Sequence, residues 1–263
     1  MPEFWYDCDG VRLYAVEEGQ GRVIVMLHAG GADHRACLPA VAPLSPRYRV
    51  ITPDLRGSGR SWCDEPLSWD RLADDVKALI DHAGAERAIV GGLSMGTGAA
   101  IRFARRFPGR TAGLVVVSPV YRGEDLGLTE HQTATFGLLD PTIARARDEG
   151  IEAFRPLYQE RGVETYFDAM IGSMDLASFI ATNQFMASGA QPFVSGADLE
   201  AVAIPTLLIP GTDPMHPAEV SNLYAAKVPQ CITAAVSDTA DWNARNLEIA
   251  AAVGNFCERR AIW

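Results

Sequence analysis

The sequence predicts an α/β fold, with a mostly parallel, doubly wound sheet that is covered by helices on both sides. Two observations carry this prediction. Short apolar runs, of the length expected for strands buried on both faces, recur along the chain, and segments with helical spacing lie between them. Alternation of this kind builds parallel sheets, because each helix returns the chain to the edge of the sheet where the next strand begins.

The first element expected is an antiparallel hairpin at one edge of the sheet. Residues Glu3–Tyr6 and Val11–Val16 are strand-like, and Asp7–Gly10 supplies turn residues between them. Six core strands are expected after the hairpin: Val23–Leu27, Val50–Thr52, Ala88–Gly91, Leu114–Ser118, Thr206–Pro210 and Ile232–Val236.

The helices expected between these strands are clearest in residues 68–84. Ser68 is suited to the N-cap position, because its hydroxyl can accept a backbone N–H of the first turn. Leu72, Val76 and Leu79 recur at helical spacing and mark one apolar face. Gly84 is suited to end the helix.

The alternation breaks between residues 119 and 200, which hold helix-like stretches but no convincing buried strand. We expect a helical lid over residues 119–200, inserted into a core made of residues 1–118 and 201–263. Most large apolar side chains of the insertion are expected to pack the lid onto the core, and a minority to line a cavity. They include Phe136, Leu139, Phe154, Tyr158, Phe167, Phe179, Phe185, Met186 and Phe193.

The composition is that of a soluble globular protein with no nucleic-acid partner. The 263 residues are 48% hydrophobic and 21% charged, and the net charge of −10 is not accompanied by a basic block. The N-terminus is too polar for a signal peptide, and no stretch approaches the roughly 18 apolar residues of a membrane span. Five scattered cysteines favour neither disulfides nor a zinc site. We therefore expect a cytoplasmic protein without metal, cofactor or membrane contact, and the oligomeric state stays open.

The segment from Gly92 to Gly96 reads Gly-Leu-Ser-Met-Gly and directly follows an apolar run. A serine hydroxyl is a poor nucleophile that needs exposure, a base and a site for negative charge. Small residues at 92 and 96 let a strand turn sharply into a helix, which leaves the Ser94 side chain above the sheet. The Met95 N–H then lies at a helix N-terminus, where negative charge is favoured. Ser94 is therefore a candidate nucleophile.

With this elbow and three further motifs, nearly the whole chain resembles the α/β-hydrolase superfamily. "VMLHAGGADH" is similar to the superfamily's oxyanion loop, "DLRGSGRS" to a structural loop, and "LLIPGTDPMHP" to the loop that bears the acid. The resemblance implies that Gly30 supplies a second oxyanion donor beside Met95, although Ala29 replaces the usual glycine. It also implies that Asp213 is the triad acid, in the order serine, acid, histidine.

The triad histidine is missing from its usual place after the last strand. The loop "SDTADW" should contain it, and Ala240 is the best candidate for the vacant position, with Thr239 and Asp241 next. His216, three residues after Asp213, is a possible relocated base, although a surface residue beside Pro217 is the stronger expectation. His28 is expected to shape the oxyanion loop.

The resemblance implies a hydrolase that acts on an ester, a lactone or an activated ketone of a fairly large apolar small molecule. Three accounts of the vacancy stay open. The chain carries an inactivating alanine at position 240, or it is a non-hydrolytic lyase or cyclase of the same fold, or it is a ligand-binding pseudoenzyme. A complete elbow at Ser94 favours the first two accounts, because a pure binder has no physical need for a serine in a strained turn.

Overall fold

The computed structural model describes residues 1–63, 65–123, 125–126, 130–160, 164–169, 171, 174–237 and 241–259. Its strands form one eight-stranded sheet in the order β1-β2-β4-β3-β5-β6-β7-β8. The first three strands of that order pair antiparallel, and all later neighbours pair parallel. The strands are β1 (Glu3–Cys8), β2 (Val11–Glu18), β3 (Val23–Leu27), β4 (Arg49–Pro53), β5 (Ala88–Leu93), β6 (Thr111–Val117), β7 (Thr206–Ile209) and β8 (Cys231–Thr233).

The described residues form ten α-helices and five short 3₁₀ helices. The α-helices are α1 (Leu38–Val41), α2 (Trp69–His82), α3 (Met95–Arg106), α4 (Glu130–Gly137), α5 (Leu139–Glu149), α6 (Arg155–Glu160), α7 (Glu164–Ala169), α8 (Leu176–Ala187), α9 (Ala218–Lys227) and α10 (Trp242–Arg259). The 3₁₀ helices are η1 (His34–Ala36), η2 (Ala42–Leu44), η3 (Pro108–Arg110), η4 (Ile151–Phe154) and η6 (Gly196–Ala201). The predicted fold class, with its N-terminal hairpin, is confirmed.

Strand β3 shows why the central strands are apolar along their whole length. Val25 and Leu27 lie in the hydrophobic cluster with α2 and α3, whereas Ile24 and Met26 lie in the second cluster with α1 and α10. Successive side chains of a strand point to opposite faces, and both faces of this strand are covered by helices. The sheet is therefore the middle layer of three.

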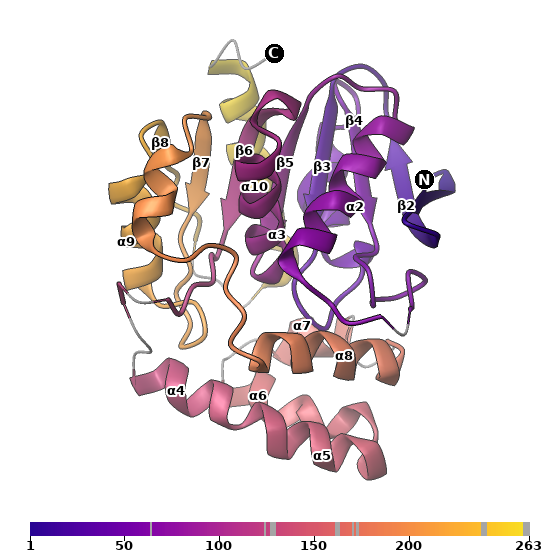
Figure 1. Cartoon of the computed structure of the whole chain (residues 1–263), viewed down its shortest axis with the longest axis vertical. Helices are drawn as coiled ribbons and strands as arrows, with labels where there is room; N and C mark the ends of the chain where they lie inside the picture. Colours follow the sequence, from indigo (N-terminus) through magenta and orange to yellow (C-terminus); the bar gives the residue numbers. More distant parts are fainter. Residues whose placement is uncertain are drawn as a thin grey trace.

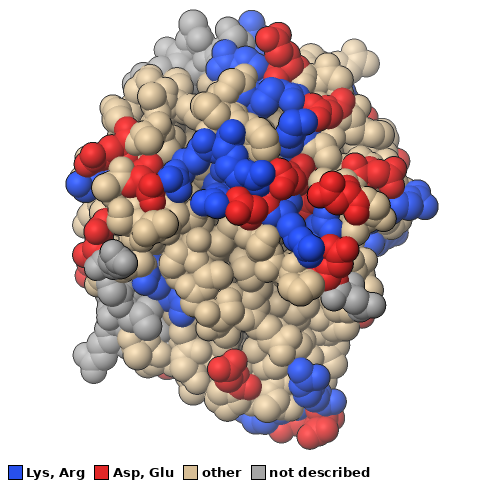
Figure 2. All heavy atoms as spheres, in the orientation of Figure 1, with Lys and Arg blue, Asp and Glu red and all other residues tan. Residues whose placement is uncertain are grey.

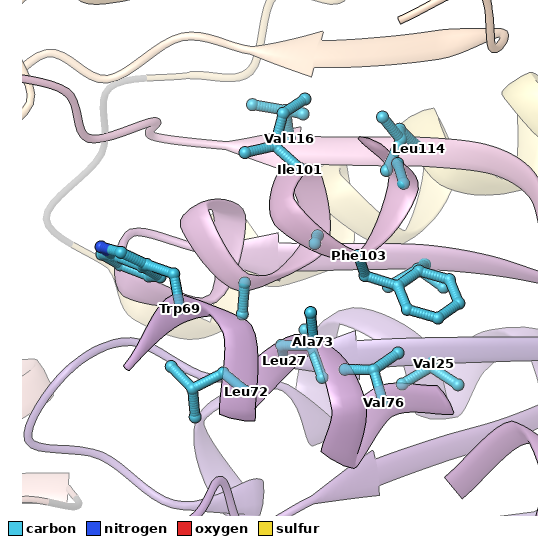
Figure 3. Close-up of a cluster of buried hydrophobic side chains, with 14 of the residues drawn as sticks. Val25, Leu27, Trp69, Leu72, Ala73, Val76, Ile101, Phe103, Leu114 and Val116 are labelled. Atoms are coloured by element: carbon cyan, nitrogen blue, oxygen red, sulfur yellow. The ribbon is translucent and has the colours of Figure 1, made fainter. Parts of the chain in front are cut away.

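Helix α2 follows the expected pattern closely. The Ser68 hydroxyl accepts the Arg71 N–H at 3.2 Å, and the helix ends at His82. Its Leu72 and Val76 side chains are buried, and Figure 3 shows them on the side of the sheet where Val25 lies. Local capping and helical spacing were sufficient to place this element.

The loop after β4 is held by two buried acids, which agrees with its expected structural role. Asp54 is 1% exposed and accepts the backbone N–H groups of His34 and Arg60, each at 2.8 Å. Arg56 is also 1% exposed and donates to Asp75 at 2.6 Å and 3.0 Å. These bonds fix the loop against η1 and α2.

Helices α4 to α8 gather at one end of the sheet, at the bottom of Figure 1. The side chains of Phe154, Phe167 and Phe179 are fully buried, in the same cluster as Ile24 and Met26 of β3. These aromatic residues of the 119–200 region therefore pack this group of helices onto the sheet.

The face with α2 and α3 carries a group of arginine side chains, seen as the central blue area of Figure 2. Arg102 contacts Asp70 at 2.8 Å, and Arg105 is paired with Asp198 at 2.5 Å. Ion pairs near the surface, such as that of Arg102 with Asp70, contribute little to stability. In the described ranges, no helix is both long and apolar enough to cross a membrane.

Candidate active site

Ser94 occupies the sharp turn between β5 and α3, with φ of 53° and ψ of −115°. The two flanking glycines are required by close contacts. A Cβ on Gly92 would lie 2.1 Å from the carbonyl carbon of Gly96, and a Cβ on Gly96 would lie 2.3 Å from the Leu27 oxygen. Only residues without a side chain allow the strand, the turn and the helix to approach this closely. The sequence therefore forces the strained backbone that lifts Ser94 above the sheet.

His216 is hydrogen-bonded to the candidate nucleophile. Its Nε2 lies 2.7 Å from the Ser94 Oγ, and its Nδ1 lies 2.7 Å from Oδ2 of Asp213. A carboxylate oxygen only accepts, so Nδ1 carries the proton of the neutral ring and Nε2 accepts the Ser94 hydroxyl. His216 is 5% exposed and Ser94 is 8% exposed. Serine, imidazole and carboxylate therefore form a continuous hydrogen-bonded chain.

The turn from Asp213 to His216 holds the acid and the imidazole together. The second carboxylate oxygen of Asp213, Oδ1, accepts the backbone N–H of Met215 at 2.9 Å and that of His216 at 3.3 Å. Gly211 lies against this turn, and a Cβ there would be 2.4 Å from the His216 Cβ. The glycine leaves the space into which His216 folds.

Sheet order brings this turn to Ser94. Strands β5, β6 and β7 are parallel neighbours, so the residues that follow β5 and β7 emerge at the same edge of the sheet, separated only by β6. The pairing continues past the strand ends: the Ser94 N–H donates to the Val117 oxygen, and the Ser118 N–H donates to the Ile209 oxygen. This ladder fixes the height at which the two loops leave the sheet.

The expectation that His216 is a surface residue beside Pro217 is wrong. The imidazole is buried, and it contacts both Ser94 and Asp213. Ser94 therefore has an imidazole partner, and it is the residue named above as a possible relocated base. The expected vacancy at Ala240 lies outside the described residues.

Three other histidines whose side chains the structure describes have partners elsewhere. His28 is fully buried; its Nε2 accepts the Leu55 N–H at 2.9 Å, so its Nδ1 proton bonds the Ala29 oxygen at 2.7 Å. Burial lowers the pKa of His28, which favours this neutral form. His34 Nδ1 lies 2.6 Å from Asp54. His82 stacks on a phenylalanine ring at the protein edge.

The two expected oxyanion donors lie beside each other. A Cβ on Gly30 would be 3.6 Å from the Met95 Sδ and 3.7 Å from its Cβ, so the loop after β3 contacts the first residue of α3. Within the described part of the chain, neither the Gly30 N–H nor the Met95 N–H donates a hydrogen bond. Two N–H groups without a described acceptor are suited to an anion: that of Met95, directly after Ser94 at a helix N-terminus, and that of Gly30 in the adjoining loop.

One group of side chains in the described ranges has the composition of a metal site: Asp33, His34 and Asp54. Its carboxylates already have protein donors. Arg35 binds Asp33 through both carboxylate oxygens, and Asp54 accepts two backbone N–H groups as well as the His34 ring. The hydrogen bonds of this cluster therefore hold η1 against the loop after β4.

Comparisons with known proteins identify the family of the chain. Residues 24–245 match the Alpha/beta hydrolase family. AB hydrolase superfamily protein YisY of Bacillus subtilis is 29% identical over 221 residues, which cover 76% of this chain and 77% of that protein.

Two solved structures resemble the chain over almost their full length. A thermophilic esterase from Thermogutta terrifontis has a TM-score of 0.82 at 22% identity, with 98% of this chain and 99% of that chain covered. The enol-lactonase from Burkholderia xenovorans has a TM-score of 0.77 at 21% identity, with 96% and 98% covered. At these identities the two likenesses show the fold. With the family match, they lead to one conclusion: the chain belongs to the alpha/beta hydrolase family and is an enzyme of the hydrolase class.

Proposed function

We propose that the chain is a serine hydrolase that cleaves esters or lactones of a fairly large apolar small molecule, with His216 as its general base. The observation that carries the proposal is the pair of 2.7 Å contacts that His216 makes with Ser94 and Asp213. In this proposal the histidine of the triad comes from the acid loop, and position 240 has no catalytic duty.

The first chemical step follows from the hydrogen bonds. Ser94 Oγ attacks the carbonyl carbon while its proton passes to His216 Nε2, and the carbonyl electron pair becomes an oxyanion. Asp213 accepts a hydrogen bond from the Nδ1–H of the resulting imidazolium, stays ionised, and holds the ring in place, as the acid of a serine triad does. The N–H groups of Gly30 and Met95 are the donors for the oxyanion.

Collapse of this intermediate returns the proton from His216 to the leaving alkoxide and leaves an acyl group on Ser94. Water then attacks the acyl carbon, with His216 as base, and the carboxylic acid departs from a regenerated serine. An activated ketone is the next candidate substrate, because its carbonyl meets the same groups. Besides the substrate and this water, the steps use only side chains and backbone groups of the protein.

The apolar character of the substrate rests on the surroundings of Gly30. The Met186 side chain of α8 lies against this glycine. Met186 also lines a small recess that is mostly apolar, with Trp69, Val120 and Phe136, and that includes two polar side chains, Arg122 and Gln191. Pockets for small molecules are usually apolar with a few placed polar groups. We propose that residues 119–200 act as a lid and that α8 forms the wall of the acyl pocket.

A fluorophosphonate probe tests the proposal, because it phosphorylates only an activated serine. The parent chain is expected to be labelled at Ser94, and His216→Ala is expected to lose labelling and about 10³-fold or more in kcat for p-nitrophenyl esters. His82→Ala removes a histidine far from the site and serves as the matched control.

The proposal and the vacancy account make opposite forecasts for Ala240→His. With His216 as the base, this variant is expected to leave activity unchanged, because Ser94 already has its base. A strong gain with this variant, together with an unlabelled parent, would show that the missing histidine belongs at 240 and would overturn the role of His216.

A further inference from the structure

The loop that carries Gly30 is held at its first peptide by the core. The Ala29 oxygen accepts the Ala32 N–H at 3.2 Å and the Nδ1 proton of His28 at 2.7 Å. A peptide unit is planar and trans, so its N–H points away from its C=O. The Gly30 N–H belongs to the same peptide unit as the Ala29 oxygen, and it is therefore turned away from His28.

The next peptide is held by a side chain from the 119–200 region. The Gly31 N–H donates to the Oγ1 of Thr182, in helix α8, at 2.9 Å. Thr182 is fully buried, and its hydroxyl lies 3.1 Å from the Ser178 oxygen and 3.2 Å from the Phe179 oxygen. Because the hydroxyl proton is directed at its own helix, an oxygen lone pair is left for Gly31.

The side of α8 that carries Phe179, Thr182 and Met186 packs on the loop. Phe179 leaves no room for a side chain at Gly31, since a Cβ there would be 2.5 Å from the ring, and Met186 lies against Gly30. Gly31 has a φ of +67°, a conformation that glycine adopts at low cost but also leaves easily. The loop therefore depends on contacts for its conformation, and α8 supplies them on the outer side.

We infer that Thr182 is a positioning residue for the oxyanion site. This inference rests on the proposed function, because it concerns the Gly30 donor of that mechanism. The core fixes the peptide before Gly30, and the Thr182 hydroxyl fixes the peptide after it. The donor then faces the developing oxyanion only while α8 is seated on the loop, so the lid helix takes part in transition-state stabilisation without touching the substrate carbonyl.

The test is a pair of variants at one position with a control on the same helix. Thr182→Val keeps the shape and removes the acceptor, Thr182→Ser restores the hydroxyl, and Ser178→Ala removes another buried hydroxyl of α8. For p-nitrophenyl butyrate, Thr182→Val is expected to lower kcat about 10- to 100-fold, below the 10²- to 10³-fold typical of losing a whole donor. KM is expected to change less than about threefold, because the hydrogen bond from the Gly30 N–H to the substrate oxygen acts mainly in the transition state.

A second readout separates oxyanion stabilisation from general damage. An aliphatic trifluoromethyl ketone adds to Ser94 as the hydroxyl proton moves to His216, and its carbonyl oxygen becomes an oxyanion. Affinity for this mimic is expected to fall with kcat in Thr182→Val and to recover in Thr182→Ser. Hydrogen exchange of the amides in residues 28–32 should speed up in the valine variant alone.

The outcomes distinguish the two proposals. A Thr182→Val protein with the parent's kcat, ketone affinity and amide exchange overturns the positioning role, and so does a Thr182→Ser protein as impaired as the valine variant. The proposed function fails separately, when Ser94→Ala keeps the parent's activity. Even then, unchanged amide exchange in Thr182→Val rejects the anchoring of the loop, and faster exchange supports it.

Discussion

Substitution of Gly211 by alanine tests whether the position of His216 is what makes Ser94 reactive. The added Cβ would lie 2.4 Å from the His216 Cβ, whereas ordinary contacts begin at 3.4 Å, so the two groups must separate by about 1 Å. If the imidazole takes up this shift, its distance of 2.7 Å from Ser94 Oγ grows to about 3.7 Å, beyond hydrogen-bond range. A displacement of about 1 Å costs on the order of 10²-fold in rate, or about 2.7 kcal/mol of transition-state stabilisation.

The measurements are kcat/KM for a p-nitrophenyl ester and the second-order rate of fluorophosphonate labelling. We expect both rates to fall about 100-fold in Gly211→Ala. Thermal denaturation shows that the variant is folded at the assay temperature, since overpacking alone costs about 1–3 kcal/mol. Gly109→Ala is the matched control, because a Cβ there meets no atom within 4 Å. Parent-like labelling of a folded Gly211→Ala protein would refute the role of His216 in activating the serine.

Three further outcomes follow from the described contacts. Asp213→Asn is expected to lower kcat by about 10⁴-fold, because it disturbs the tautomer that His216 needs, and a loss of less than tenfold would remove Asp213 from the mechanism. Burial lowers the pKa of His28 below 6.5, so the unfolded chain takes up a proton first and the free energy of unfolding should decrease as the pH falls below about 6.5. Urea denaturation at pH 7.5 and 5.5 measures this decrease, and an equal decrease in His28→Gln would assign it to other groups. Asp75→Ala leaves Arg56 buried without its bidentate partner and should cost about 3–5 kcal/mol in urea denaturation, whereas a cost below about 1 kcal/mol would contradict the buried pair.

Features set by neighbouring residues were predictable from the sequence. The sharp turn at Ser94 depends on small residues two positions on either side and on the apolar run before it, all within one short segment. The expectation that Gly30 supplies an oxyanion donor beside Met95 came from the superfamily resemblance of the loop after β3, and β3 is the neighbour of β5 in the sheet. Glycines in such a pattern indicate the geometry directly, because a strand and a helix cross closely only where side chains are absent.

The partner of the serine was not predictable in the same way. Residues 94 and 216 are 122 positions apart, and their contact depends on the order of β5, β6 and β7 in the sheet. The superfamily resemblance instead places the histidine in the loop around position 240. A signal was nevertheless present, since Asp213 and His216 are three residues apart after an apolar strand, and Gly211 precedes them. The hydrogen bond from Gly31 to Thr182 had no sequence signal, because it joins a loop to a helix 151 residues away.

The turn from Asp213 to His216 also determines what sets the distance between the acid and the imidazole. When acid and base stand on different loops, every shift of one loop alters their separation. Here both belong to one short segment whose backbone N–H groups already bind the acid, so the pair moves as a unit. The separation between the Asp213 carboxylate and the His216 imidazole is therefore set within one short segment. For protein engineers, the six residues from Gly211 to His216 form a short segment that can be grafted. Placed after the corresponding strand of a sheet with the same strand order, it would bring in a histidine together with its carboxylate partner.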